Sequence, residues 1–386
     1  MGKIKKLELL RNYISLDTSR KDGKYYTEAA ELIAGELKAI GLDAELIEVP
    51  EDIAGAAGRV NVIARSKTKE DLPTLLVYNH MDVVPANYDG AFELKETNVV
   101  LYGRGAADHK GSSVALIEAL SEVGLERLRF NLVMIFTTDE ETEQMAQLEY
   151  LESKLNLPEN TICFDPDTMA GGVTVAHLGT WHFTLTVKGK SAHSAASHLG
   201  VNAIEKSFLL APRFFELKAK QEAITSKVPA FGGEQVRNRF NVNMLNAGTA
   251  QNVVPEFAEL QIDCRFVPEA NISEQTRLIR DEINKEAERL GIDIEFSNEQ
   301  IIPGNITQHA EADVLDRVIK EVTGTGGGQY AVMGSTPVAA WCASLQIPHI
   351  GLGVARVESS MHGVDENCLE QDYLDLAEIF KRYVVK

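Results

Sequence analysis

Three short segments place side chains that can bind metal ions directly after apolar runs of strand length. They are Asn79-His80-Met81-Asp82-Val83-Val84-Pro85, Gly103-Arg104-Gly105-Ala106-Ala107-Asp108 and Thr138-Asp139-Glu140-Glu141. Asp165 and His362 lie farther along the chain in similar settings. Imidazole and carboxylate ligands without a thiolate are typical of metal sites that activate water near neutral pH. The spacing therefore indicates a two-metal hydrolytic site.

The expected ligand set contains two neutral imidazoles and three carboxylates, for two zinc ions per subunit. Its members are His80, Asp108, Glu141, Asp165 and His362. Three negative charges against two dications leave one positive charge, which a bridging hydroxide would neutralise. Asp108 is the candidate for the shared ligand, because its two oxygens can serve both ions. Cobalt or manganese could substitute, since N/O ligands discriminate weakly among these ions.

Two neighbouring carboxylates are expected to support the ligands. Glu140 stands beside Glu141, and adjacent side chains on an extended backbone diverge, so one can bind metal while the other faces substrate. We assign Glu140 as the general base that takes a proton from activated water and hands it to the leaving amine. Asp82 is placed to accept the second N–H of His80 and to fix its tautomer.

The first half of the chain alternates strand-like and helix-like patterns. The expected strands are residues 60–64, 74–78 and 132–136, and a helix is expected over 112–123. This alternation predicts an α/β fold with a mixed or parallel sheet and helices on both faces. In such sheets the functional groups lie just past the carboxyl ends of strands. His80, Glu140 and Asp165 all follow apolar runs and fit that position.

A different pattern begins after Leu178. Its strands and helices follow the order βαββαβ, which predicts a small α+β domain of helices on an antiparallel sheet. The α/β pattern returns near Pro303. We therefore predict a catalytic domain in two segments, residues 1–178 and 299–386, with residues 179–298 inserted as a second domain.

The composition of the chain limits the classes of partner that it can bind. The chain has 386 residues and a net charge of -19, which argues against a nucleic acid or an anionic membrane as partner. No signal peptide or membrane-spanning run is expected. The four cysteines have no CxxC spacing, and we interpret them as free thiols of a cytoplasmic enzyme.

The metal-binding segments resemble the signature blocks of the co-catalytic zinc amidohydrolases. That family contains carboxypeptidase G, acetylornithine deacetylase, succinyl-diaminopimelate desuccinylase, the aminoacylases and several dipeptidases. The likeness continues in the same order along the chain, through residues 164–166, 189–194, 200–203, 252–255, 263–265 and 361–366. It implies that the inserted domain is a dimerisation or lid domain of a homodimer.

The resemblance also implies which residues share each ion. His80, Asp108 and Asp165 would hold one zinc. Asp108, Glu141 and His362 would hold the other. The peptide bond that follows Asp108 would be cis.

Further roles are implied around the substrate. His193 would reach the neighbouring subunit's site and stabilise the oxyanion, and Asn252 and Arg265 would bind a substrate carboxylate or carbonyl. For Arg265 a cross-strand ion pair is an equally good interpretation. Arg356, six residues before His362, is a further candidate for the carboxylate, and the alternative for it is simple solvation of a loop.

The chain departs from the family pattern at three places. The substrate loop, often Gly-Thr-Asp or Gly-Ser-Asp, is Gly334-Ser335-Thr336-Pro337 here, without the Asp. His109 replaces a familiar Met, and Glu143 replaces a familiar Gly. None of these changes removes a ligand, but the first leaves the substrate open.

The leading hypothesis is a zinc-dependent hydrolase that cleaves the amide bond of N-acyl amino acids, as a deacetylase or desuccinylase. The alternative within enzymes is a dipeptidase or another exopeptidase of the same family. A non-catalytic homologue that binds amino acid derivatives is the alternative outside enzymes. The presence of all five ligands and of the base argues against it.

Overall fold

The computed structural model describes residues 7–19, 25–55, 57–97, 99–142 and 145–385. The chain divides into two compact units. The first contains residues 1–175, 307–330 and 336–386, and the second contains residues 176–306 and 331–335. The predicted domain boundaries, after residues 178 and 298, stay predictions. The strand that spans the second of them runs on to Ile302.

The first unit is built on a mixed sheet. Its strands follow the order β1-β2-β6-β3-β7-β19-β8, and the pairs β3–β6, β3–β7 and β7–β19 are parallel. The bounds are β1 (Asp43–Glu48), β2 (Val60–Arg65), β3 (Thr74–His80), β6 (Asn131–Thr137), β7 (Thr161–Asp165), β8 (Val173–His177) and β19 (His349–Gly351). Because β3, β6 and β7 are parallel, their carboxyl ends meet at one edge of the sheet.

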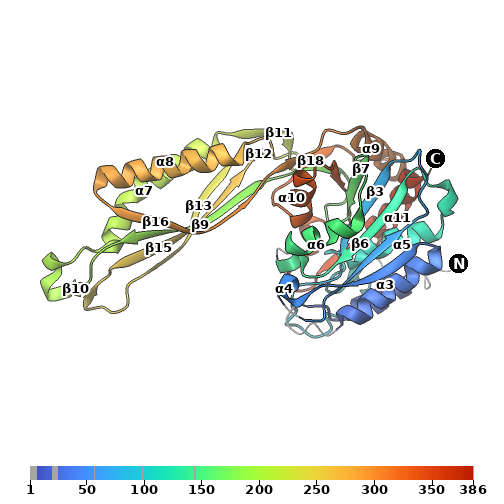
Figure 1. The fold of residues 1–386 in the computed structure, drawn as a ribbon, viewed down its shortest axis with the longest axis horizontal. Helices are drawn as coiled ribbons and strands as arrows, with labels where there is room; N and C mark the ends of the chain where they lie inside the picture. The colour runs from blue at the N-terminus through green and yellow to red at the C-terminus, as the bar shows by residue number, and fades with distance from the viewer. Residues whose placement is uncertain (1–6, 20–24, 56, 98, 143–144, 386) are drawn as a thin grey trace. The chain divides into compact units, whose positions relative to one another are not determined.

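Helices cover both faces of this sheet (Figure 1). One layer contains α2 (Glu8–Ile14), α3 (Tyr26–Ile40), α5 (Lys110–Ser121), α9 (Ala310–Thr323) and α11 (Glu370–Val384). The other contains α4 (Glu51–Ala54), α6 (Met145–Leu155) and α10 (Pro337–Ser344). All seven residues of β3 are buried, which explains the continuous apolar run of that strand. The predicted α/β class, with a mixed sheet covered on both faces, is confirmed.

Shorter strands complete the first unit. β4 (Lys95–Glu96), β5 (Val100–Tyr102) and β20 (Asn367–Leu369) form a separate small antiparallel sheet. In this sheet Asn367 pairs with Tyr102. The loop that follows β5 and the loop that precedes β20 therefore lie side by side, although they are far apart in the sequence. β17 (Asn305–Ile306) and β18 (Gln329–Val332) lie where the chain passes between the units.

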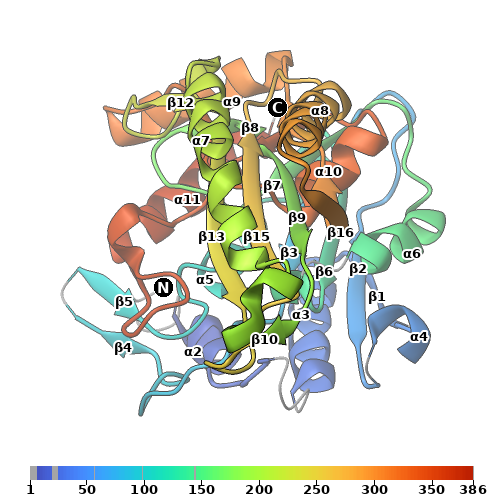
Figure 2. The same cartoon turned by 90° about the vertical axis from the view of Figure 1, so that its left-hand side faces the viewer.

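The second unit has two long helices on one face of an antiparallel sheet (Figure 2). The sheet order is β13-β15-β9-β16. The main elements are β9 (Gly179–Lys188), α7 (Ala203–Glu222), β13 (Arg239–Ala247), β15 (Phe257–Phe266), α8 (Ile272–Leu290) and β16 (Asp293–Ile302). Their order confirms the predicted βαββαβ pattern. Two small pairs accompany it, β10 (Ala192–His193) with β14 (Val253–Val254), and β11 (Thr225–Pro229) with β12 (Gln235–Arg237).

Alternate side chains of the strands β9 and β15 are buried in the hydrophobic core of the second unit. Along β15 every second residue from Ala258 to Phe266 is buried, and the residues between them are more exposed. The buried side chains pack with apolar residues of α7 and α8, including Leu210 and Ile283. Asn271 caps the start of α8, because its side chain accepts a hydrogen bond from the Glu274 N–H, and Gly291 caps the end of the helix in the left-handed conformation.

Candidate active site

Three of the five predicted metal ligands, His80, Glu141 and Asp165, lie at or just after the carboxyl ends of the central parallel strands β3, β6 and β7. His80 is the last residue of β3 and pairs with Thr137 of β6, which directly precedes the segment with Glu140 and Glu141. Asp108 lies in the loop between β5 and α5, and His362 lies in the loop before β20. The pairing of β5 with β20 brings these two loops together.

Asp82 lies against both His80 and the segment with Glu141. The Nδ1 of His80 lies 3.1 Å from the backbone oxygen of Asp82 and 3.4 Å from its Oδ1. The other carboxylate oxygen of Asp82 accepts a hydrogen bond of 3.0 Å from the Glu141 N–H. The backbone oxygen of Asp82 therefore orients the imidazole, while its carboxylate orients the neighbouring acidic segment. The predicted role of the carboxylate as the acceptor for His80 stays a prediction.

His109 supports His80 from the other side. The peptide bond between Asp108 and His109 is cis, as the resemblance implied. The His80 N–H donates to the Nε2 of His109 at 2.8 Å, so the proton of this ring is on Nδ1, which lies 3.0 Å from Ser113 Oγ. Burial holds the pKa of His109 well below its ordinary value, so the ring is neutral. Ser113 in turn donates to Asn79.

Asp108 stands between two imidazoles. Its Oδ1 lies 3.2 Å from His80 Nε2, and its Oδ2 lies 3.0 Å from His362 Nε2. Burial raises the pKa of Asp108, but the hydrogen bond with His362 and the close imidazole of His80 outweigh burial and hold the pKa well below its usual range. The two oxygens of one carboxylate thus face two different nitrogen ligands, which is the geometry expected of a shared ligand.

Glu141 completes the group around His362. The Nε2 of His362 lies 3.0 Å from Glu141 Oε2, and the side chains of Glu141 and Asp108 are both 7% exposed. The hydrogen bond with Asp108, followed by that with Glu141, raises the pKa of His362 to about 10. Asp108, Glu141 and His362 offer three ligand atoms within 4.8 Å of one another.

A second group contains His80, Glu140 and Asp167, whose ligand atoms also lie within 4.8 Å of one another. Asp167 Oδ2 is 3.7 Å from His80 Nε2. Burial is the main cause that raises the pKa of Glu140 well above its ordinary value and that of Asp167 to about 7. Burial also lowers the pKa of His80, but Asp108, Asp167 and Asp82 outweigh it and raise the pKa well above the usual range.

Asp165 is placed elsewhere. It is fully buried at the end of β7, and its Oδ2 lies 3.0 Å from His349 Nε2. Its Oδ1 accepts a hydrogen bond of 2.9 Å from the Asp167 N–H. The structure thus brings Asp167 to His80 and pairs Asp165 with His349, which is itself buried. Asp167 was missed because Phe164-Asp165-Pro166 matched the family block.

The groups fit metal ions by their donors and by their unsatisfied atoms. All ligand candidates are imidazoles and carboxylates. Among the described residues, the buried atoms His80 Nε2, Asp108 Oδ1 and Glu141 Oε1 have no hydrogen-bond partner. Buried polar atoms normally have partners, and a bound cation would satisfy all three. Asp108 belongs to the group with Glu141 and His362, and its Oδ1 also faces His80 of the second group. Asp108 therefore links the two groups.

Two predicted residues of the second unit lie together at one end of it. His193 in β10 pairs with Val253 in β14, and the Ser194 N–H donates to the carbonyl of Asn252 at 3.0 Å. The His193 side chain is exposed, and its Nδ1 accepts a hydrogen bond from the Ala195 N–H. The roles of His193 and Asn252 stay predictions.

The two arginines proposed as carboxylate anchors are each paired with an acid of the chain. Arg265 makes two hydrogen bonds of 3.0 and 2.9 Å to Asp263 of the same strand. Arg356 makes two, of 2.5 and 2.8 Å, to Asp372. Arg265 is thus ion-paired along its own strand and not across strands, and Arg356 is ion-paired and not simply solvated. A substrate role for either arginine stays a prediction.

Gly334 and Ser335 lie in the segment between β18 and α10. The Gly334 carbonyl accepts a hydrogen bond from the Leu178 N–H, and Thr336 caps α10 by accepting from the Ala339 N–H. The missing Asp of the family loop thus coincides with a helix start at Pro337. A substrate role for Gly334 and Ser335 stays a prediction.

Comparison with known proteins identifies the family. The model of peptidase family M20/M25/M40 matches residues 76–386. The chain belongs to this family. It is therefore a metal-dependent hydrolase of peptide or amide bonds. Among the described residues, three groups of side chains are placed so that they could hold a metal ion: the two that contain Asp108 and His80, and a third, buried group of Asp165, His177 and His349.

Solved structures with the same fold include several peptidases. Aminopeptidase PepT from Bacillus cereus matches with a TM-score of 0.78 at 17% identity, over 100% of this chain and 98% of that one. An M20 metallo-carboxypeptidase from Sulfolobus solfataricus matches with a TM-score of 0.74 at 18% identity, over 99% and 98%. A dinuclear metal-binding M20 peptidase from Bacillus subtilis matches with a TM-score of 0.67 at 17% identity, over 98% and 97%.

Proposed function

We propose that this M20 peptidase is a dinuclear zinc enzyme that cleaves short peptides, with Glu140 as general base. One ion would be held by His80, Asp108 and Asp167, and the other by Asp108, Glu141 and His362. The observation that carries the proposal is the position of Asp108, whose two oxygens lie 3.2 and 3.0 Å from the two imidazoles. Bound zinc would polarise the scissile carbonyl and make water acidic enough to lose a proton near pH 7.

The chain's own groups then divide the remaining work. Two contacts fix Glu141: its backbone N–H donates to Asp82, and its carboxylate is paired with His362. Neither contact involves the neighbouring Glu140. Burial raises the pKa of Glu140, so its carboxylate can hold a proton taken from water and release it to the leaving amine. The imidazole of His80 is oriented by the backbone oxygen of Asp82, and the backbone N–H of His80 is held by His109.

Short peptides are the first candidate substrates because the anchors expected for an N-acyl amino acid are occupied. Arg265 and Arg356 each face an acid of the chain, which weakens the argument that either binds a free substrate carboxylate. Structures of the same fold include a Staphylococcus aureus tripeptidase and the dipeptidase Dug1p of Saccharomyces cerevisiae. A deacylase of N-acyl amino acids is the second candidate. A protein of the same fold is described as an aminobenzoyl-glutamate utilization protein from Klebsiella pneumoniae.

The test is hydrolysis by the zinc-loaded protein of unblocked di- and tripeptides beside N-acetyl and N-succinyl amino acids. Cleavage of unblocked peptides alone is the expected result. Cleavage of blocked substrates alone would move the protein to the deacylase branch. Two bound zinc ions without hydrolysis of either class would support the non-catalytic alternative.

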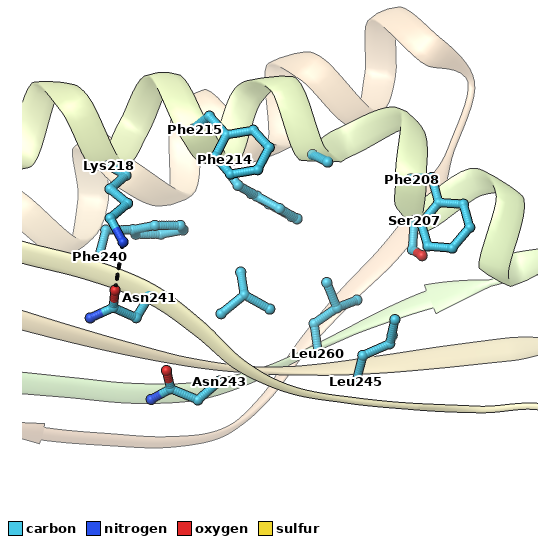
Figure 3. Close-up of a pocket in the computed structure, with 12 residues that line it drawn as sticks. Ser207, Phe208, Phe214, Phe215, Lys218, Phe240, Asn241, Asn243, Leu245 and Leu260 are labelled. Atoms are coloured by element: carbon cyan, nitrogen blue, oxygen red, sulfur yellow. Dashed lines mark hydrogen bonds between the residues drawn. The ribbon is translucent and has the colours of Figure 1, made fainter.

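We also infer that the protein is a homodimer through the face formed by α7 and β13. Figure 3 shows a groove between this helix and the strand, and it has a volume of about 350 Å³. The face exposes large apolar side chains, with Phe208 62% and Phe215 72% exposed. β13 is at the edge of its sheet, so among the described strands it has a partner on one side only. Exposed apolar surface beside a free strand edge suits a self-complementary interface.

A pair of measurements tests the dimer. Light scattering should give twice the chain mass for the wild type and the chain mass for Phe208→Ser/Phe215→Ser. If His193 serves the partner's site, the monomeric variant should also lose most of its activity while it keeps its zinc. A fully active monomer would contradict the role of His193.

Two observations bear on the location of the protein in the cell. The structure contains no helix, among its described residues, that is long and apolar enough to cross a membrane. All four cysteines are free and buried. Free thiols support a reducing compartment, and we keep the cytoplasm as the proposed location.

A further inference from the structure

A buried ion pair joins the two loops that carry Asp108 and His362. Arg104 Nη1 donates to Glu366 Oε2 at 2.6 Å, and the two side chains are 2% and 1% exposed. The residues are 262 positions apart in the sequence. Each lies a few positions from a predicted ligand, Arg104 from Asp108 and Glu366 from His362.

The carboxylate of Glu366 holds the backbone of the Asp108 loop. Its Oε1 accepts hydrogen bonds from the N–H groups of Gly105, Ala107 and Asp108, at 3.0, 3.1 and 3.0 Å. A carboxylate that accepts three backbone donors fixes the direction of that loop. The third donor belongs to the residue whose carboxylate faces both imidazoles.

The guanidinium of Arg104 holds the His362 loop in return. Its Nη2 donates to the carbonyl of Gly363 at 3.1 Å and approaches the carbonyl of His362 at 3.5 Å. Within this loop Ser360, His362 and Asp365 all have positive φ, of 51°, 62° and 59°. Residues other than glycine adopt this conformation at a cost, so contacts with the surroundings must maintain it.

We propose that Arg104 and Glu366 are positioning residues that hold His362 in register with Asp108 and Glu141, so that the three form one metal site. The inference rests on the proposed dinuclear function. Neither residue touches substrate in this role. The pair acts through the loops. A variant that breaks the ion pair but keeps the three backbone N–H bonds to residue 366 leaves the Asp108 loop in place, so it should weaken the site of His362 and leave the site of His80 and Asp167 intact.

Two conservative variants break the pair in different ways. In Glu366→Gln one oxygen still serves the three backbone N–H groups, but the amide NH2 then faces the guanidinium and cannot accept from it. In Arg104→Lys one ammonium can reach Glu366, but it lacks the planar fork that also serves the carbonyls of His362 and Gly363.

The chain offers a matched control far from the ligands. Arg129 makes two hydrogen bonds to Glu311, at 2.9 and 2.7 Å, and joins segments 182 residues apart. Their side chains are 22% and 16% exposed. Arg129→Lys and Glu311→Gln therefore remove a comparable long-range ion pair without touching either ligand loop.

The experiment is a zinc titration of each metal-free protein in competition with a chromophoric chelator, with thermal unfolding measured on the same samples. His362→Ala identifies which of the two binding constants belongs to its site. We expect Arg104→Lys and Glu366→Gln to lower that constant by about 10- to 100-fold and to leave the other unchanged, as for other residues that orient metal ligands. The control variants should keep both constants even if they lower the unfolding temperature.

Other outcomes overturn the inference. If both constants survive in Arg104→Lys and Glu366→Gln, the ion pair has only a structural role, and if the controls lose zinc equally, the effect is general destabilisation. Should Glu366→Gln fail to fold, Arg104→Lys alone decides. A wild-type protein that does not bind two zinc ions would instead refute the proposed function itself.

Discussion

Asp165 and Asp167 compete for one position in the metal site, and exchanging each for Asn separates them. Asp167 has a carboxylate oxygen 3.7 Å from His80 Nε2, whereas Asp165 contacts His349 and the Asp167 N–H. Asp167→Asn should therefore remove a charged ligand. Asp165→Asn should disturb only the support of that ligand, because an Asn oxygen can still accept from the Asp167 N–H.

The magnitudes follow from these positions. Loss of a group that orients a metal ligand typically costs about 10- to 100-fold in affinity, or about 1.4 to 2.8 kcal/mol, and we expect Asp165→Asn in this range. Loss of the ligand itself should cost more than about 100-fold, because its charge opposes that of the ion directly. Asp167→Asn should then keep one tightly bound zinc where the wild type keeps two.

The assay is zinc stoichiometry after equilibrium dialysis at several free zinc concentrations, with the far-ultraviolet circular dichroism of each variant as a control for folding. The reasoning is refuted if Asp165→Asn loses an ion and Asp167→Asn retains both. In that case the alignment with the family block, and not the geometry around His80, identifies the ligand.

Three further outcomes are expected. Glu140→Gln should bind zinc normally but lose about 10²- to 10⁴-fold in kcat, and unchanged turnover would exclude it as the base. Zinc binding at pH 7 should release protons, because His362, with a pKa of about 10, is protonated at that pH and Asp167, with a pKa of about 7, is partly protonated. Calorimetry in buffers of different ionisation enthalpy measures the number of protons released. That number should fall as the pH rises towards 10. Arg59→Met should lower the free energy of unfolding in urea by about 3 to 5 kcal/mol, because the buried Asp139 loses its cation at 2.8 Å, and a loss below about 1 kcal/mol would show that the pair is solvated.

The fold class was predictable because its signals are local. The apolar run of β3 and the alternation along β15 indicate buried and half-buried strands wherever they occur in a chain. The ends of some elements were less predictable. The helix predicted over residues 112–123 is α5, which begins at Lys110 and ends at Ser121. The side chain of Lys110 is buried and donates to the carbonyls of Tyr13 and Leu16, contacts that the periodicity of the sequence does not show.

The supporting contacts of the site could not be predicted from spacing. Glu366 and Arg104 each look like an ordinary charged residue of a loop in the sequence, and their burial arises only when β5 pairs with β20. His109 looked like a departure from a family motif, whereas it accepts a hydrogen bond from the backbone of His80. Such roles depend on partners that are far apart in the chain.

The sequence by itself determined the kind of chemistry: imidazoles and carboxylates, without thiolates, placed after apolar strands in an order that indicates a metal-dependent amide hydrolase. Only the tertiary structure decided which side chains face one another. After β7 the chain turns, with Asp165 accepting the Asp167 N–H, so the alternation of the strand no longer determines which carboxylate points to His80. A sequence motif specifies donor types over a few residues, whereas a metal site requires distances that the packing of separate loops creates.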